Sequence, residues 1–390
     1  MRNQINMTIP VNSLGYGMQA LGFYHLLKEA GYNIHVKKIG SNFIEPSVLA
    51  LLENLNLDNA MQEDIKRRPL DAANYIVWHP KGFLDNKMTG VPNIGSGCFE
   101  IEPITAEDQI GFSSVDVAVT HSDWGLSQIV NPNKCLVHGP SWSTYGLHLP
   151  DAIDIPKLNS NPLFMSPGKW EERKSHPLLT KILTRRAMEG KNFSLLAFWD
   201  NIFTGNLNQP LTNLRGQGWV ISNLYNFNNQ MCYNMTLNGS HIFLMDHIVK
   251  YTDMLALYKK TIGMISLSKG EGWDMPAIDA LGLGIPALLT DNTAHLEYSN
   301  SLARVEYGEH KIISANDGIW FRDEGNWYTP DEDICNIKVN MFMDKCATGS
   351  KWFWTDEYVK KLTTIQDPNV IVNQIETAIG KAENVISGIH

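Results

Sequence analysis

Four charged side chains stand among four glycines in the segment "SKGEGWDMPAIDALGLGIPALLTD", which runs from Ser268 to Asp291. The charged residues are Lys269, Glu271, Asp274 and Asp279, and the glycines are Gly270, Gly272, Gly282 and Gly284. Apolar runs flank the segment, which predicts a strand, a loop, a helix and a second strand. The loop N–H groups and the dipole of the following helix both favour negative charge. We therefore predict an anion site in the loop from Gly270 to Met275.

The two acids of this segment have different expected surroundings. Pro276 suits the first turn of the predicted helix, and Asp274 can cap it. Asp279 follows in the first turns, where an unpaired buried carboxylate would be costly. Glu271 lies in the loop, eight positions before Asp279. The two carboxylates either grip different hydroxyls of one polyol-bearing nucleotide or are two ordinary acids, and the residue types alone do not decide between these interpretations.

A second glycine pattern occurs near the start of the chain. The residues "GYGMQA", from Gly15 to Ala20, fit the G-x-G-x-x-A form of the dinucleotide-binding fingerprint between a predicted strand and a predicted helix from Met18 to Ala30. That fingerprint needs an acid about 20 residues further on, where this chain has Lys37 and Lys38. A nicotinamide cofactor is therefore disfavoured. The pattern is either a tight turn without a ligand or a place where a phosphate or an acceptor comes close.

Strands and helices alternate along the chain in two series, which predicts the α/β class with two doubly wound, Rossmann-like domains. The predicted strands of the first series are "INMTIPV", "YNIHVKKI", "NYIVWH" and "VDVAVTHS"; those of the second are "NPLFMSPGKW", "FSLLAFWD", "GWVISNLY", "IGMISLSKG" and "IPALLTD". Three prolines near residue 155 indicate a linker, because proline resists both helix and central strand. We expect domains at 1–155 and 156–350 and a helical segment at 351–390. Two domains imply a cleft between them.

Composition excludes several classes of protein. The 390 residues are 43% hydrophobic and 19% charged, which is typical of a globular protein rather than a disordered or fibrous one. The net charge of -9 argues against wholesale coating of nucleic acid, because that binding depends on Lys and Arg. Five scattered cysteines without a C-x-x-C pair predict reduced thiols. Neither a signal peptide nor an apolar membrane span is recognisable, so we expect a cytoplasmic protein.

Several of these motifs together resemble a known family. "SLSKGEGWDMPAIDALGLGIPALLT" resembles the signature of family 4 retaining glycosyltransferases of the GT-B fold, with its Gly-Glu-Gly-aromatic run and a second acid eight residues after the first. "NPLFMSPGKWEERKSHPLLTKIL" resembles the first strand of the family's C-terminal domain and its two basic residues. "GCFEIEPIT", "VDVAVTHSDWG" and "CLVHGP" resemble segments of the N-terminal half in one branch of the family. The resemblance covers most of residues 10 to 300.

The resemblance implies a GT-B architecture, two Rossmann-like domains facing each other across a cleft, with the C-terminal helix returning to the N-terminal domain. It implies that Lys169 and Lys174 bind the diphosphate of a nucleotide-diphosphate sugar, and that Glu271 acts with them in catalysis. The remaining donor contacts implied are Lys269, Gly270, Gly272, Trp273 and, for the ribose, Asp279. It implies front-face attack, in which the leaving phosphate accepts the proton, so that no protein base is needed. Since cations and amides can stabilise the departing charge, we expect no metal.

On the acceptor or phosphate side, the candidate residues are Gly15, Tyr16, Gly17, Glu100 and His121, with His79 as a further one; a histidine or glutamate in such places is more often structural. The chain departs from the family pattern where Asp279 replaces Glu, Lys169 replaces Arg and His121 replaces Pro. The only Asp-x-Asp, Asp331–Asp333, lies in an acidic, surface-like stretch and is a poor metal site.

The acceptor stays open between a glycan, a small molecule and a modified nucleic acid. Small basic clusters (Lys66, Arg67, Arg68; Arg185, Arg186) and late aromatic residues (Trp320, Phe321, Trp327, Trp352, Phe353, Trp354) are either solvated and core residues or an acceptor surface. One alternative function is therefore glucosylation of a modified DNA base, which would have to leave the helix. Another is a non-catalytic nucleotide-sugar-binding protein of the same fold.

Overall fold

The structure, a computed structural model, describes residues 3–40, 44–149, 161–201, 203, 207–227, 230–245, 250–305, 311–318, 321–349 and 351–388. Contacts divide the chain into two compact units. Unit 1 comprises Met1–Leu147, Glu271–Met275 and Lys360–His390, and unit 2 comprises His148–Gly270 and Pro276–Val359. The linker prediction centred on residue 155 lies outside the described residues.

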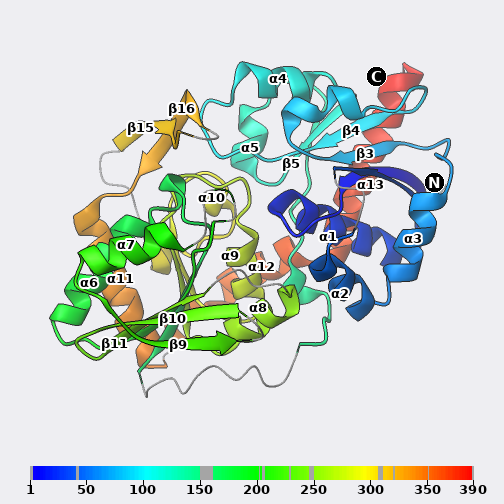
Figure 1. The fold of residues 1–390 in the computed structure, drawn as a ribbon. Helices are drawn as coiled ribbons and strands as arrows, with labels where there is room; N and C mark the ends of the chain where they lie inside the picture. The colour runs from blue at the N-terminus through cyan, green and yellow to red at the C-terminus, as the bar shows by residue number, and fades with distance from the viewer. Residues whose placement is uncertain are drawn as a thin grey trace. The chain divides into compact units, whose positions relative to one another are not determined.

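Unit 1 contains an all-parallel sheet of order β2-β1-β3-β4-β5-β6 (Figure 1). Its strands are β1 (Gln4–Pro10), β2 (Asn33–Ile39), β3 (Asn74–Val77), β4 (Asn93–Ser96), β5 (Val117–Thr120) and β6 (Lys134–Leu136). Its helices are α1 (Gly15–Glu29), α2 (Pro46–Asn54), α3 (Asp58–Lys66), α4 (Ala106–Ser113), α5 (Asp123–Gln128) and α13 (Pro368–Ser387), with 3₁₀ turns η1 (Pro80–Gly82), η2 (Leu84–Asn86) and η3 (Trp142–Thr144). The strand β1 pairs with β2 on one side and with β3 on the other. After β2, the following strands are therefore added on the opposite side of β1.

Strand β1 is buried on both faces, as expected for a parallel sheet covered by helices. Ile5, Met7 and Ile9 on one face and Asn6 and Thr8 on the other are all fully buried. The helix that follows begins at Gly15 rather than at Met18, so the predicted glycine turn is in fact the first turn of α1. A Cβ at Gly17 would lie 2.2 Å from the backbone oxygen of Asn12. The fingerprint glycine thus has a packing reason that needs no ligand.

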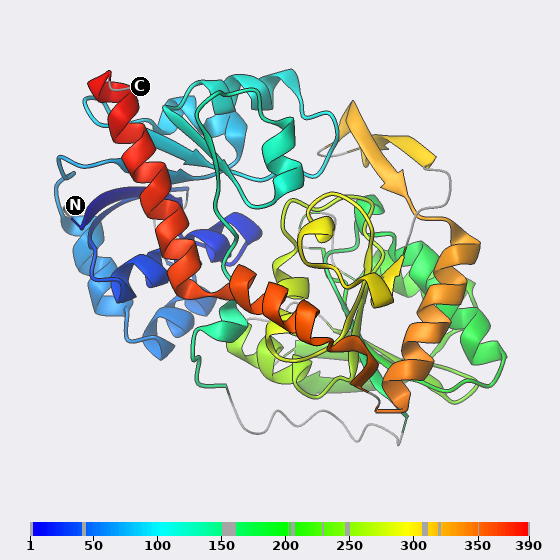
Figure 2. The same ribbon diagram turned by 180° about the vertical axis from the view of Figure 1, so that it is seen from behind.

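The C-terminal helix α13 belongs to unit 1 and contacts α1, β4, β5 and β6, which confirms the predicted return of the chain (Figure 2). Asp367 caps it by accepting a 2.8 Å hydrogen bond from the N–H of Asn369, and Pro368 occupies the first turn. The Tyr32 hydroxyl donates to Glu376 at 2.9 Å, and the His138 N–H donates to the Gln374 side chain at 2.9 Å. These contacts anchor the tail on the first sheet.

Unit 2 contains a sheet of order β14-β13-β12-β7-β8-β11-β10-β9. Its strands are β7 (Leu163–Pro167), β8 (Ser194–Phe198), β9 (Val220–Phe227), β10 (Gln230–Leu237), β11 (Ser240–Met245), β12 (Gly263–Ser266), β13 (Ala287–Thr290) and β14 (Arg304–Val305). Pairing is parallel from β14 to β11 and antiparallel from β11 to β9. The prediction that "GWVISNLY" continues the parallel series was therefore wrong. A two-residue turn, Asn238 and Gly239, connects β10 and β11 as a hairpin.

The remaining elements of unit 2 are mostly helices. The helices are α6 (His176–Met188), α7 (Asn208–Gly216), α8 (Tyr251–Tyr258), α9 (Met275–Gly282), α10 (His295–Tyr298) and α11 (Glu332–Ala347). The others are the hairpin of β15 (Lys311–Asn316) and β16 (Arg322–Thr329) and the 3₁₀ turns η4 (Glu172–Lys174), η5 (Ser301–Ala303) and η6 (Lys351–Phe353). Helix α12 (Asp356–Gln366) leads to α13. No helix among the described residues is both long and apolar enough to cross a bilayer.

Two surface-like motifs have structural roles in unit 2. The Asp331 carboxylate caps α11 by accepting hydrogen bonds from the N–H groups of Asp333 and Ile334 at 2.9 and 3.0 Å. Of the two arginines of α6, Arg186 is buried and pairs with Asp344 at 2.6 Å, while the exposed Arg185 pairs with Glu332 at 2.5 Å. These ion pairs join α6 to α11.

Two of the late aromatic residues belong to the core, and Phe321, Trp352 and Trp354 are half-buried. Trp327 and Phe353 are buried, and Phe353 contacts the rings of Trp352 and Trp354. Trp320 lies outside the described residues. The five cysteines, which are all described, form no disulfide.

Candidate functional site

The sheet of unit 2 reverses its order between β7 and β12. The chain runs from β7 to β8 and β11 on one side, then returns to place β12 on the other side of β7. In open α/β sheets, ligands bind outside the carboxyl ends of the strands at such a switch point. Here the loop at 168–175 follows β7, and the loop that begins at 267 follows β12, so the two loops start at the same sheet edge.

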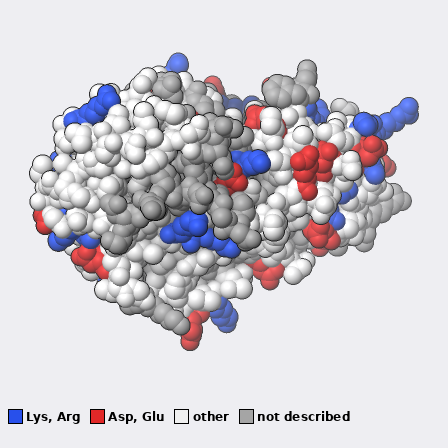
Figure 3. Space-filling model, turned by 60° about the horizontal axis from the view of Figure 1, so that its bottom comes forward, with Lys and Arg blue, Asp and Glu red and all other residues white. Residues whose placement is uncertain are grey.

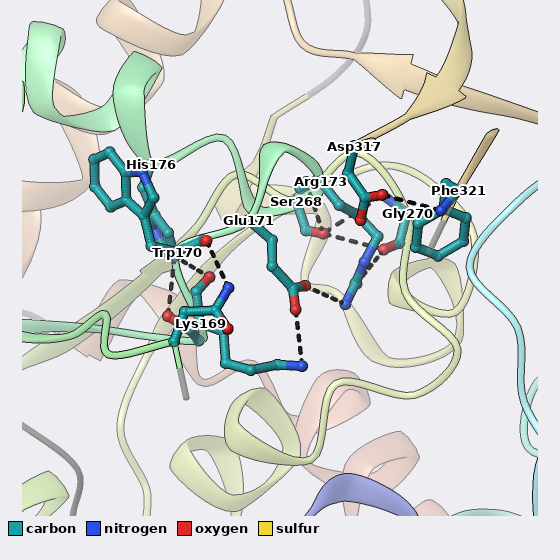
Figure 4. Close-up of polar contacts among 11 residues, drawn as sticks. Lys169, Trp170, Glu171, Arg173, His176, Ser268, Gly270, Asp317 and Phe321 are labelled. Carbon is teal, nitrogen blue, oxygen red and sulfur yellow. Dashed lines mark hydrogen bonds and ion pairs between the residues drawn. The ribbon is translucent and has the colours of Figure 1, made fainter. Parts of the chain in front are cut away.

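Hydrogen bonds hold these two loops together (Figure 4). The N–H of Lys269 donates to the carbonyl oxygen of Arg173 at 2.7 Å, and the Arg173 guanidinium donates to the carbonyl oxygen of Gly270 at 2.7 Å. The Ser268 hydroxyl donates to the same Gly270 oxygen at 3.1 Å. The hairpin strand β16 adds a bond from the Tyr328 N–H to the Lys269 oxygen at 3.0 Å. Arg173, which the sequence analysis missed, is thus a buried clamp between the loops.

The first loop contains both cations and acids, and they pair with one another. Lys169 pairs with Glu171 at 2.8 Å, and Arg173 pairs with the other oxygen of Glu171 at 3.3 Å. Lys269 of the second loop pairs with Glu172. Burial alone would raise the pKa of Glu171, but the charges of Arg173, Lys169 and Lys174 lower it to about 2. The predicted cationic loop therefore carries its own counter-ions.

His176, at the start of α6, fixes the backbone of this loop. Its Nε2 lies 3.1 Å from the carbonyl oxygens of both Gly168 and Lys169. Because carbonyl oxygens only accept, Nε2 carries the proton. The ring lies against Trp170 and Trp199, with centroids 5.6 and 4.9 Å away. Burial and the charge of Lys174 lower the pKa of His176 to about 3, so the ring is neutral.

Lys174, the last residue of η4, lies close to the start of the same loop. A Cβ on Gly168 would be 3.2 Å from Lys174 Cε, so the lysine stem runs along the glycine. The structure thus places both predicted diphosphate ligands, Lys169 and Lys174, in one short loop at the switch point of unit 2.

Asp279 lies on α9 and is fully buried, more deeply than predicted. Its carboxylate accepts a hydrogen bond from the hydroxyl of Tyr251 on α8. The sequence gives no signal that relates Tyr251 to Asp279, because no spacing rule relates residues on separate helices. A partner of this kind removes the cost that an isolated buried carboxylate would have.

The segment Glu271–Met275 packs within unit 1. Glu271, Trp273 and Asp274 are all buried. The Trp273 ring stacks on His138, with centroids 6.0 Å apart, and meets His121 at 6.4 Å. A Cβ on Gly139 would lie 2.4 Å from the Trp273 ring, so only glycine leaves room for this indole.

The predicted acceptor-side residues lie at the carboxyl ends of the unit 1 strands. The Tyr16 hydroxyl donates to the carbonyl oxygen of Cys98 at 2.7 Å, and its ring contacts Trp78 and His79 with centroids 6.0 and 6.2 Å away. Burial and the nearby Cys98 and Glu100 raise the pKa of Tyr16, so the phenol is neutral. Gly15 and Gly17 flank Tyr16 in the first turn of α1. These residues gather beside β1 and β3, where the order of the first sheet reverses.

His121 follows β5 and is fully buried. Its Nδ1–H donates to the carbonyl oxygen of Val137 at 2.8 Å. Burial lowers its pKa to about 4, so the ring is neutral at physiological pH. The structure gives His121 a packing role beside Trp273 and Phe23.

We expect the two buried histidines to make the fold acid-sensitive. Below pH 6.5 the unfolded chain binds a proton at each histidine, whereas the folded chain binds it only below about 4 at His121 and about 3 at His176. Stability is therefore fully present above pH 6.5 and falls as the pH drops towards 4. In thermal melts from pH 7.5 to 4.5, His121→Gln and His176→Gln should each show a smaller fall in Tm than wild type. Identical slopes for wild type and both variants would contradict the prediction.

Comparisons with known proteins identify the fold. No protein-family profile matches the chain, and no curated protein is similar in sequence. Among solved structures, a glycosyltransferase from Rickettsia africae is 14% identical, with a TM-score of 0.58 and 98% of each chain covered. HepE from Anabaena in complex with UDP is 9% identical (TM-score 0.62; 97% of this chain and 99% of that one). Sucrose-phosphate synthase from Thermosynechococcus elongatus is also 9% identical (TM-score 0.63; 96% and 97%). The chain has the GT-B fold of these glycosyltransferases.

Proposed function

We propose that the protein is a retaining glycosyltransferase that moves a sugar from a nucleotide-diphosphate sugar to an acceptor. The observation that carries the proposal is the meeting of two hydrogen-bonded loops at the switch point of unit 2. The buried Arg173 joins the loops, Lys169 and Lys269 each pair with an acid of the first loop, and Lys174 runs along Gly168. The fold supports it, since similar structures include HepE with UDP and with UDP-glucose.

The reaction breaks a sugar–phosphate bond and leaves a nucleoside diphosphate. In our proposal Lys169 and Lys174 stabilise the charge that develops on the departing diphosphate, together with the amides of Lys269, Gly270, Gly272 and Trp273. Groups that are already in place do this without reorganising during the reaction. The loop is held by Arg173 and His176, which supports such a role. Glu271, which follows Gly270 in the chain, holds the donor sugar.

For the ribose we propose the Asp279–Tyr251 pair. Asp279 is one methylene shorter than the glutamate of the resembling family, and it already accepts the Tyr251 hydroxyl. A phenol bound to this carboxylate can extend its reach, because Tyr251 is only partly buried while Asp279 is inaccessible.

We propose that no metal takes part, because the site has lysines and an arginine where a transferase of another kind would need a divalent cation. Transfer should therefore proceed at the same rate in EDTA and in Mg²⁺. The transferred sugar should keep its anomeric configuration, which proton NMR of the product measures.

The acceptor side belongs to unit 1 in our proposal, where Tyr16, His79 and Glu100 lie near the start of α1. The acceptor remains a glycan, a small molecule or a modified base in DNA. On the face drawn in Figure 3, described Lys and Arg residues stand beside Asp and Glu residues and form no continuous basic surface. The net charge of -9 favours an acceptor other than DNA.

A thermal-shift screen of UDP-, GDP-, ADP- and dTDP-sugars, followed by a transfer assay with the stabilising donor, tests the proposal. We expect one nucleotide series to raise Tm and its sugar to be transferred or slowly hydrolysed with retention. Binding without turnover would favour the non-catalytic alternative. Salt-sensitive retention on DNA would favour the modified-base alternative, and no response to any nucleotide would contradict the proposed function.

A further inference from the structure

We propose that the Glu171 carboxylate occupies the anion position of the unit 2 site when no ligand is bound, and that the donor diphosphate binds by displacing it. The inference rests on the proposed function, because it concerns how the same site accepts its ligand. It makes Glu171 a residue that sets donor affinity and selectivity.

The contacts of Glu171 are those that a phosphate would make. Its two oxygens accept from the Lys169 ammonium at 2.8 Å and the Arg173 guanidinium at 3.3 Å, as Figure 4 shows. Charge-assisted hydrogen bonds to separate cations are also how proteins hold phosphate oxygens. The carboxylate therefore stands in a place whose chemistry suits any oxyanion.

Exposure shows how a ligand could enter. The Glu171 side chain is only 9% exposed, whereas the Lys169 side chain that it contacts is 40% exposed. An incoming anion can thus bind the Lys169 ammonium from solvent, in place of Glu171, while the Glu171 side chain turns away. Arg173 stays in position during the exchange, because its other nitrogen is bonded to the Gly270 oxygen.

Proton uptake does not drive this exchange. Three neighbouring cations keep the pKa of Glu171 at about 2, so the carboxylate remains charged at any pH where the fold is stable. The exchange is one anion for another. A diphosphate has more charge and more acceptor oxygens than a carboxylate, so it should displace Glu171 where singly charged anions do not.

A carboxylate that occupies the site competes with the ligand. The apparent affinity is then the intrinsic affinity multiplied by the fraction of protein in which the site is open. Glu171→Gln removes the negative charge but keeps the shape. We expect this variant to bind UDP and inorganic pyrophosphate with a Kd about tenfold lower than wild type, as measured by titration calorimetry on the full chain. The matched control is Glu332→Gln, because Glu332 also pairs with two cations, Lys181 and Arg185, on another part of unit 2. Its Kd values should equal those of wild type.

The outcomes separate this inference from the proposed function. If wild type transfers sugar but Glu171→Gln binds both probes no more tightly, or more weakly, Glu171 only positions Lys169 and Arg173, and the inference is overturned. If Glu171→Gln binds pyrophosphate more tightly but wild type acts on no nucleotide sugar, the inference stands and the proposed function fails. If neither protein binds either probe, the inference is overturned, and the screen of four nucleotide series decides the proposed function. If Glu171→Gln does not fold, Glu171→Asp serves instead, because the shorter acid cannot reach both cations. This variant should also bind pyrophosphate more tightly than wild type. An unchanged Kd for pyrophosphate would overturn the inference.

Discussion

Glu271→Ala should lower kcat/KM for sugar transfer by about a thousandfold and leave the protein folded. In the proposed site this carboxylate holds the donor sugar as the bond to phosphate breaks, so its loss removes an interaction that matters most in the transition state. Glu271 is buried, at 4% exposure, and Glu271→Gln therefore serves as the variant that keeps its volume. Initial rates with the donor found by the screen give kcat/KM, and circular dichroism checks the fold.

The matched control for Glu271 is Glu63→Gln. Glu63 is an exposed acid of unit 1 that pairs with the exposed Lys66. This variant should have wild-type activity. If Glu271→Gln and Glu271→Ala, both folded, transfer sugar within threefold of wild type, Glu271 does not have the role assigned to it.

Lys174→Ala should have an effect of similar size, about a thousandfold on kcat, together with a Kd for UDP about tenfold higher. The ammonium neutralises the leaving diphosphate, whose charge grows during the reaction, so kcat should fall more than binding does. Lys174→Arg should recover part of the rate, because it keeps the charge but changes its geometry. Rapid-quench assays give kcat, and calorimetry gives Kd.

The control for Lys174 is Lys181→Ala on α6, where the lysine is half exposed and pairs with Glu332. It removes the same charge from the same unit, so it tests whether net charge alone matters. Equal losses in both variants would show a general electrostatic effect and contradict the assignment of Lys174 to the diphosphate.

The sequence was most informative where local signals agree with the fold. The apolar run before Lys269, the loop glycines and Pro276 predicted a strand, loop and helix, and β12 and α9 confirm them. The helical segment predicted at 351–390 contains α12 and α13, and Asp367 and Pro368 mark the start of α13. Such signals depend on neighbours in the chain, so they survive without knowledge of distant contacts.

The errors have identifiable causes. The dipeptide Asn238–Gly239 is a strong hairpin signal, yet the regular alternation of strands and helices led us to extend the parallel series through β9. The start of α1 was placed too late because glycine has a low helix propensity, whereas Gly17 is required there by the close approach of Asn12.

The ion pairs of the site could not be predicted from the chain. Arg173 and Gly270 lie 97 positions apart, and Lys269 pairs with Glu172 over the same separation. In the sequence, "EERK" is typical of a solvated charge run, and only the pairing of β7 with β12 brings it to the second loop. For the same reason Tyr251 emerged as the partner of Asp279 only from the packing of α8 and α9.

A crystal structure of the protein with bound UDP tests the central claim most directly. We expect the diphosphate to lie at the carboxyl ends of β7 and β12, with its oxygens within hydrogen-bond distance of Lys169 and Lys174 and of the amides that follow Ser268. A diphosphate bound elsewhere, with neither lysine in contact, would contradict the account.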